Sequence, residues 1–208
     1  MFVALRHLTA LALLGASQGS GSTIFPTGVA YSNWADESEE ARVCEIVLDA
    51  SNPPSREAVK FITIAGYNKF DGTVLAGFLM GAADLTASGT YQIVRISAAA
   101  FSSRTFNSLG HLDYESYDDG TVMATTQDPL VATAFIRAVI AGVYEVHFAR
   151  PDSNAEMRTY KIASAPGESV VTNFMHCMDH LAVESHRTQS DASTEGRPLP
   201  EGGARNHF

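Results

Sequence analysis

The chain has 208 residues, of which 45% are hydrophobic and 18% are charged, and it contains 16 Gly, 8 Pro, 2 Cys and 1 Trp. This composition is typical of a globular protein and excludes collagen-like, disulfide-dense and wholly disordered classes. The formal net charge is -9 and no run of basic residues is present, which argues against nucleic acid as a partner. The length predicts one domain with short appendages.

The N-terminus has the pattern of a secretory signal peptide over residues 1–17. Arg6 lies in a short first region, residues 8–14 are apolar, and Gly15 and Ser17 supply small residues near the end. The apolar stretch is much shorter than the roughly 20 residues that cross a bilayer. We therefore expect a periplasmic or secreted protein with no membrane span after removal of the leader, and a linker over residues 18–27.

Two cysteines, Cys44 and Cys177, are the only candidates for a disulfide. In an oxidising compartment such a pair is usually structural, so we expect the two to be bonded. The alternative is a nucleophilic thiol at Cys177 beside His176.

Short stretches with period-two alternation follow the linker and predict a β-rich domain over residues 28–183. In the first of them, Cys44, Ile46 and Leu48 share one face and are expected to point into the core. Asp71-Gly72 predicts a tight hairpin turn, and Gly120 closes a second one. Further strands are predicted at residues 58–69, 73–80, 90–97, 110–117, 121–126, 143–149 and 156–163.

Two helices are predicted in the second half of the chain. The first begins at Asp128-Pro129, an N-cap acceptor followed by proline, and ends at Gly142. The second begins after Pro166-Gly167 and runs to about Val183. Its buried arc is predicted to contain Val170, Phe174, Cys177, Met178 and Leu181. Residues 184–208 are polar without periodicity and predict a disordered tail. The expected fold is a mainly β protein, a β-sandwich of antiparallel strands with two short helices.

The order of these features resembles the invasion-associated locus B family of small exported bacterial proteins. The resemblance is carried by Trp34 followed by Cys44-Glu45-Ile46, by the helix that ends at Gly142 before a strand and hairpin, and by Tyr160-Lys161-Ile162 with Phe174 and Leu181. It implies a periplasmic, non-enzymatic β-sandwich, in some members linked to host interaction. It supplies no catalytic residues.

The sharpest chemical pattern is His176 and His180, four apart on the second predicted helix, with Asp179 between them. On a helix the two imidazoles share a face and could bind a divalent metal, with Asp179 as a third candidate ligand. The alternative is a set of solvated polar residues. A separate, acidic segment predicts either a solvated hairpin or a calcium site. It comprises His111, Asp113, Glu115, Asp118 and Asp119.

No serine elbow, glycine-rich phosphate loop or His-Glu-x-x-His motif is present, so a hydrolase would have to use a site without a recognised motif. Trp34 is expected in the core, with an aromatic contact patch of Phe25, Tyr31 and Trp34 as the alternative. The expected function is that of an exported, non-enzymatic binding or structural module without a cofactor. Its partner would be a protein or another envelope component.

Overall fold

The structure is a computed structural model that describes residues 22–38, 40–151 and 157–194, with the backbone alone for 184–194. The predicted signal peptide lies outside these residues. Within them the strands form two sheets. The larger has the order β2-β3-β4-β5-β9-β8, with β6 beside β5, and the smaller has the order β1-β11-β10-β7. Every pairing is antiparallel except β1 with β11.

The long strands of the large sheet are β2 (Gly28–Glu37), β3 (Ala41–Asn52), β4 (Glu57–Asn68) and β5 (Val74–Leu85). The shorter ones are β6 (Tyr91–Val94), β8 (Asp113–Ser116) and β9 (Val122–Thr126). The small sheet contains β1 (Ser22–Ile24), β7 (Ala98–Ser103), β10 (Tyr144–Ala149) and β11 (Met157–Ile162). The helices are η1 (Pro53–Ser55), α2 (Pro129–Ala141) and α3 (Glu168–Thr194).

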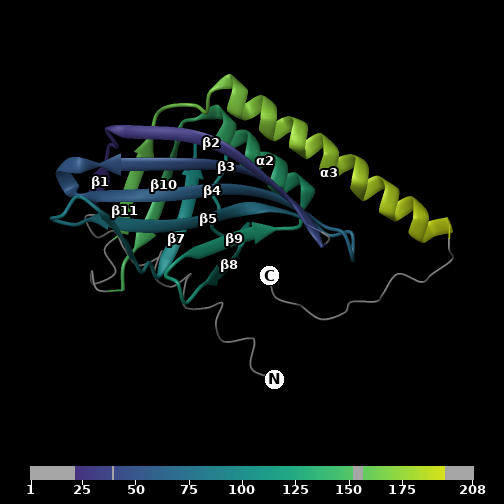
Figure 1. Cartoon of the computed structure of the whole chain (residues 1–208), viewed down its shortest axis with the longest axis horizontal. Helices are drawn as coiled ribbons and strands as arrows, with labels where there is room; N and C mark the ends of the chain where they lie inside the picture. Colours follow the sequence, from purple (N-terminus) through teal and green to yellow (C-terminus); the bar gives the residue numbers. More distant parts are fainter. Residues whose placement is uncertain (1–21, 39, 152–156, 195–208) are drawn as a thin grey trace.

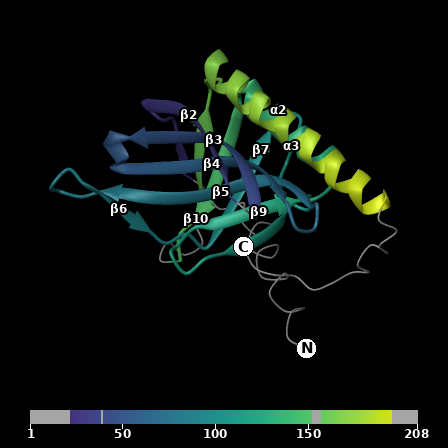
Figure 2. The ribbon, with the colours of Figure 1, turned by 45° about the vertical axis from the view of Figure 1, so that its right-hand side comes forward.

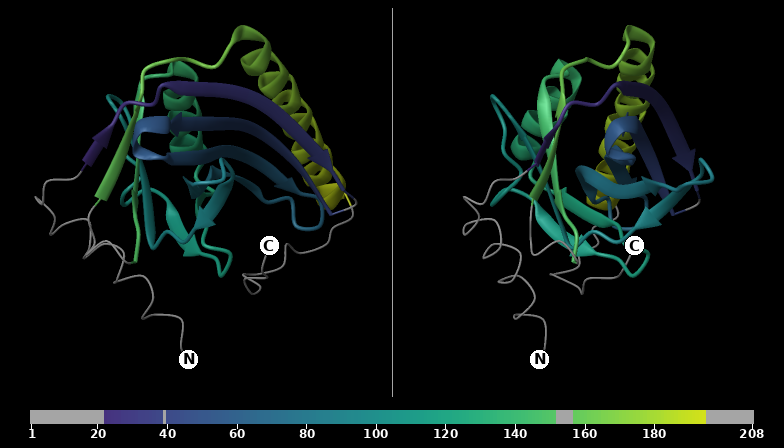
Figure 3. Two further views of the ribbon diagram at one scale, coloured as in Figure 1. Left: turned by 60° about the vertical axis from the view of Figure 1, so that its left-hand side comes forward. Right: turned by 90° about the vertical axis from the view of Figure 1, so that its left-hand side faces the viewer.

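The large sheet is curved, and one of its faces is covered by everything else in the fold (Figure 1). The small sheet crosses one end of the long strands, and α3 lies along their other end (Figure 3). Helix α2 packs on β5 and β9. We call the covered side of the large sheet the inner face and the opposite side the outer face. The mainly β, sandwich-like fold expected from the sequence is confirmed.

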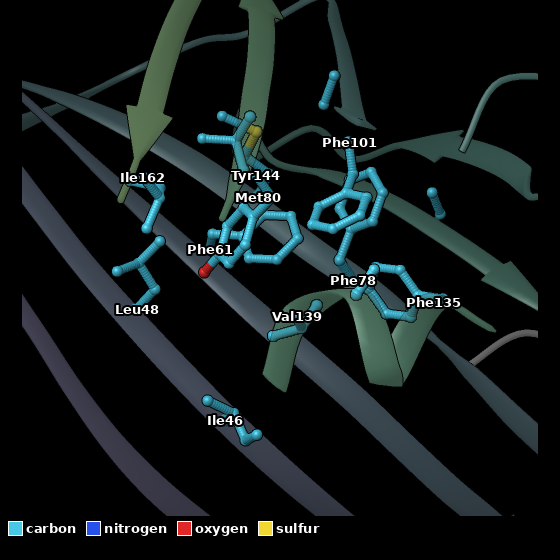
Figure 4. Packing of buried hydrophobic residues seen from close by; sticks show 14 of the residues in the cluster. Ile46, Leu48, Phe61, Phe78, Met80, Phe101, Phe135, Val139, Tyr144 and Ile162 are labelled. Atoms are coloured by element: carbon cyan, nitrogen blue, oxygen red, sulfur yellow. The ribbon is translucent and has the colours of Figure 1, made fainter. Parts of the chain in front are cut away.

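Aromatic rings hold the two layers together at the centre of the inner face (Figure 4). Phe61 and Phe78 of the large sheet have ring centroids 5.0 Å apart. Phe101 of the small sheet lies 5.8 Å from Phe61 and 5.2 Å from Phe135 of α2. All four side chains are fully buried. Clusters of this kind contribute beyond their buried area because tilted and edge-to-face rings are mutually attractive.

Local chemistry sets the limits of α2 where the sequence predicts them. The Asp128 carboxylate accepts hydrogen bonds from the backbone amides of Leu130 and Val131 at 2.8 and 3.3 Å. Gly142 ends the helix at φ 73°. A Cβ at this position would lie 2.1 Å from the Cα of Ala165, so both the backbone conformation and the close approach require glycine.

The predicted disulfide is present and fastens α3 to the large sheet. Cys44 of β3 and Cys177 of α3 are bonded, with their Cα atoms 5.9 Å apart. The arc predicted for the helix is correct, since Phe174 and Leu181 are buried on the inner face and Cys177 is partly buried. The period-two prediction for Cys44, Ile46 and Leu48 is also confirmed.

Several predicted boundaries are wrong. Residues 22–24 of the expected linker form β1, whose Ile24 is buried. The sequence does not predict this strand, because three residues are too few to show alternation. Helix α3 is not short, since it continues to Thr194, well into the expected tail. The sequence does not predict this extension, because a polar helical stretch has no apolar period to detect. Residues 195–208 lie outside the described residues. Strand β7 was not predicted, because the first four of its residues are buried irrespective of alternation.

Trp34 is not in the core. It lies on β2, at the edge of the large sheet, and 53% of it is exposed. Among the described residues no helix is long and apolar enough to cross a membrane.

A buried ion cluster joins the two sheets beside the aromatic core. Arg150 donates hydrogen bonds to both carboxylate oxygens of Asp84, at 2.9 and 2.6 Å, and to Glu57 at 2.9 Å. Arg158 also pairs with Glu57. Glu57 and Asp84 are register neighbours on the large sheet, whereas both arginines follow or lie in strands of the small sheet. Glu57 is only 4% exposed, so its charge depends on these partners.

Replacing Glu57 by Gln is expected to lower the free energy of unfolding by about 3–5 kcal/mol, because it removes the buried carboxylate that pairs with Arg158 and shares Arg150 with Asp84. Urea unfolding measures the change. The control is Asp49→Asn, which removes the exposed Asp49–Lys60 pair and should cost under about 1 kcal/mol. Equal losses in the two variants would contradict a structural role for the cluster.

Candidate functional site

The outer face of the large sheet holds an apolar groove of about 770 Å³. It spans the end of the sheet where the small sheet crosses β2, β3, β4 and β5 on the inner face. Strand β6 lies beside β5 at this end (Figure 2). The lining residues are Gly28, Val29, Ala30, Asp49, Ala50, Ser51, Ala58, Val59, Lys60, Ile62, Leu79, Gly81, Ala82, Ala83, Tyr91, Ile93 and Thr121. We call this feature the outer groove.

The floor of the outer groove is low because small side chains lie side by side across neighbouring strands. Ala58 of β4 is opposite Ala83 of β5, which in turn is opposite Ile93 of β6. Gly81 contributes no side chain at all, and a Cβ built there would meet only the Thr121 methyl group at 3.5 Å. Alternation along the strands sends these residues away from the core, so no other element fills the space.

Large apolar side chains form a rim on the β6 side of the groove. Ile93 is 71% exposed and Tyr91 is 54% exposed. Contiguous exposed apolar surface of this kind is uncommon on a solvated sheet face and marks binding sites for apolar ligands or partners.

One ion pair lies within the apolar lining. Asp49 and Lys60 are register neighbours on β3 and β4, with the Lys60 ammonium 3.5 Å from the carboxylate. Their side chains are 54% and 58% exposed. A pair this open to water contributes little to stability and can exchange partners.

The two histidines predicted as metal ligands face a second, smaller cleft of about 370 Å³ between α3 and the end of β2. The rings of His176 and His180 are 4.7 Å apart, and both residues are exposed. Asp36 and Glu37 of β2 line the same cleft. Glu37 forms ion pairs with Arg42 and Lys69, which hold the pKa of its carboxyl below the ordinary value.

The third predicted ligand does not join this cleft. Asp179 is exposed and is absent from its lining, because one position on a helix turns its side chain away from His180. In the part of the chain that the structure describes, no three His, Cys, Asp or Glu side chains are gathered around one point.

The acidic hairpin is organised by local turns. Asp119 accepts hydrogen bonds from the amide and hydroxyl of Thr121, at 2.9 and 2.7 Å. Asp113 and Glu115 are exposed on β8, and His111 lies in the preceding turn. These side chains therefore belong to a solvated hairpin, the first of the two alternatives that the sequence allows.

A polar chain on the far side of the small sheet was not predicted. The His147 ring has Ser102 Oγ at 2.8 Å from Nε2 and Thr159 Oγ1 at 2.9 Å from Nδ1. Burial lowers the pKa of His147 below 6.5, against a smaller opposite effect of Glu145, which is itself paired with Lys161. The imidazole is thus neutral at neutral pH and accepts one hydrogen bond while donating the other.

This arrangement places a serine beside a histidine, but the second ring nitrogen bonds Thr159 and not a carboxylate. Strand β10 is paired on both sides, so its backbone amides are used within the sheet. Among the described contacts of Ser102, none supplies a donor aimed at an oxyanion. The chain of hydrogen bonds is best understood as a way to satisfy polar groups across β7, β10 and β11.

Comparison with protein-family models, with curated proteins and with solved structures finds no match to this chain. The family resemblance stated above therefore stays a prediction.

The sequence does not predict the outer groove, because its floor consists of alanines and glycines from different strands. Only the register brings them together.

The His147 chain predicts a pH dependence of stability. Since burial lowers the pKa of His147, the unfolded chain takes up its proton at a higher pH than the folded one. The free energy of unfolding should therefore fall as the pH drops below about 6.5. Urea midpoints between about pH 7.5 and 5.5 test this, with His147→Gln expected to show a shallower decline. Parallel pH profiles for the two proteins would refute the assignment.

Proposed function

We propose that the protein is an exported binding module that holds an apolar ligand in the outer groove. The observation that carries this proposal is the groove itself, an open apolar hollow with a floor of small residues and a rim of exposed Ile93 and Tyr91. A sheet face that only met water would alternate toward polar side chains here. The rest of the fold acts as a scaffold that keeps the sheet in shape.

Two features support export. The first is the signal-peptide pattern of residues 1–17. The second is the disulfide between Cys44 and Cys177, since such bonds persist in oxidising compartments and are rare in the cytosol. The surrounding compartment would then be the periplasm or the extracellular space.

Filling the groove should abolish ligand binding. Gly81→Val adds a side chain to the floor at a position with ordinary van der Waals space and with a backbone conformation open to any residue. The neutral apolar fluorophore N-phenyl-1-naphthylamine serves as the probe in a fluorescence titration. We expect saturable binding by the native protein and at least about tenfold weaker binding by Gly81→Val.

Ser32→Val is the matched control. Ser32 is exposed on the same face of the sheet but does not line the groove, so the added side chain should leave the affinity for the probe unchanged. Circular dichroism checks that both variants keep the fold. No saturable binding, or equal affinity in the native protein and Gly81→Val, would overturn the proposal.

A second candidate function is the binding of a divalent transition metal by His176 and His180. The observation that favours it is their placement one turn apart at a cleft that Asp36 and Glu37 also line. Two imidazoles one helical turn apart are donors suited to zinc or nickel. Among the described residues no carboxylate gathers with the two histidines around one point, so the protein ligands would be the imidazoles.

Equilibrium dialysis with Zn²⁺ alone tests this second function. The native protein is expected to bind one equivalent, and His176→Ala or His180→Ala should weaken binding at least about tenfold. His111→Ala removes an exposed histidine elsewhere and should leave the affinity unchanged. Unchanged zinc binding after loss of both His176 and His180 would exclude the site.

A further inference from the structure

The outer groove is not uniformly apolar, and the position of its one cation indicates what kind of ligand it takes. Lys60 is the cationic side chain among the lining residues. It lies in the middle of the groove, on β4, between β3 and β5. Since the whole chain carries a net charge of -9, a cation placed inside an apolar hollow is a local departure from an acidic protein.

The two sides of Lys60 differ. On the β3 side its register neighbour is Asp49, to which its ammonium is paired at 3.5 Å. On the β5 side its register neighbour is Gly81, which has no side chain. A Cβ built on Gly81 meets only the methyl group of Thr121. The Lys60 side chain therefore borders an open hollow on one side only.

Asp49 also lines the groove, but no glycine opens the floor directly beside it. Its register neighbours are Lys60 on β4 and Ala30 on β2, and the methyl group of Ala30 occupies the space that Gly81 leaves open on the other side. The floor is thus higher beside Asp49, where Ala30 carries a methyl group, than beside Lys60, where Gly81 carries none. An anionic group can approach Lys60 from above Gly81.

Apolar surface continues from the hollow toward the margin of the sheet. Ala83 lies two residues along β5 from Gly81, on the same face, and Ile93 is its register neighbour on β6. The hydroxyl of Thr121 donates to Asp119, so this residue turns its methyl group toward the hollow. The groove surface thus changes from charged at Lys60 to apolar at Ala83 and Ile93.

We infer that the ligand of the outer groove is an anionic amphiphile of the fatty-acid type, whose carboxylate binds Lys60 above Gly81 and whose chain lies over Ala83 and Ile93. This inference rests on the proposed function. The ligand anion competes with Asp49 for Lys60, which is feasible because the Asp49–Lys60 pair is more than half exposed to water and correspondingly weak.

The test compares dodecanoate with dodecanol as competitors of N-phenyl-1-naphthylamine. The two have the same chain and differ in charge at neutral pH. The native protein should bind dodecanoate about tenfold more tightly than dodecanol, as expected for one charge-assisted hydrogen bond. Lys60→Gln should remove this difference, measured as the ratio of the two affinities within the same variant.

Lys161→Gln is the matched control. Lys161 is also a half-exposed lysine in a single carboxylate pair, at 3.0 Å from Glu145, but it lies on the small sheet. It should retain the preference for dodecanoate. Equal competition by the two compounds in the native protein, or an unchanged preference in Lys60→Gln, would overturn the inference. Since the fluorophore is neutral, its binding reports on the groove separately, and failure of that binding would instead refute the proposed function.

Discussion

The fold depends on one requirement, which is to cover the inner face of a curved sheet whose long strands are apolar on that side. No single element is large enough to do so. The small sheet covers one end, α3 covers the other and α2 packs on β5 and β9. The ring cluster around Phe61 and Phe101 forms where these parts meet, and the ion cluster around Glu57 joins the two sheets. The ring cluster holds both the small sheet and α2, whereas the disulfide fastens α3.

The same arrangement leaves the outer face free. Because α2 and α3 both pack on the inner side, neither covers the residues that alternate outward. Small residues at Ala58, Gly81 and Ala83 lower the floor, and β6 raises one margin. A rigid scaffold with an open apolar hollow is a suitable basis for recognition, since the site is formed before the ligand arrives.

The sequence predicts those features that local chemistry or one buried face determines. Asp128 and Gly142 mark the ends of α2, and the alternation around Ile46 identifies a core strand. Prediction fails where no local signal exists. Alanines buried on both faces hide β7, and a polar helix after Val183 resembles a tail. The outer groove and the cleft that both Asp36 and His176 line depend on contacts between distant segments, which periodicity does not encode.

The disulfide also constrains how the chain reaches this structure. Cys177 follows Cys44 by 133 positions, so the bond forms only after nearly all of the described domain has been synthesised. With 2 cysteines in the whole chain, one intramolecular bond is available, and the only wrong pairing joins two molecules. Maturation therefore requires a thiol oxidase but no isomerase to correct mispaired bonds. Oligomers linked through Cys44 or Cys177 would be the characteristic by-product of crowded or premature oxidation.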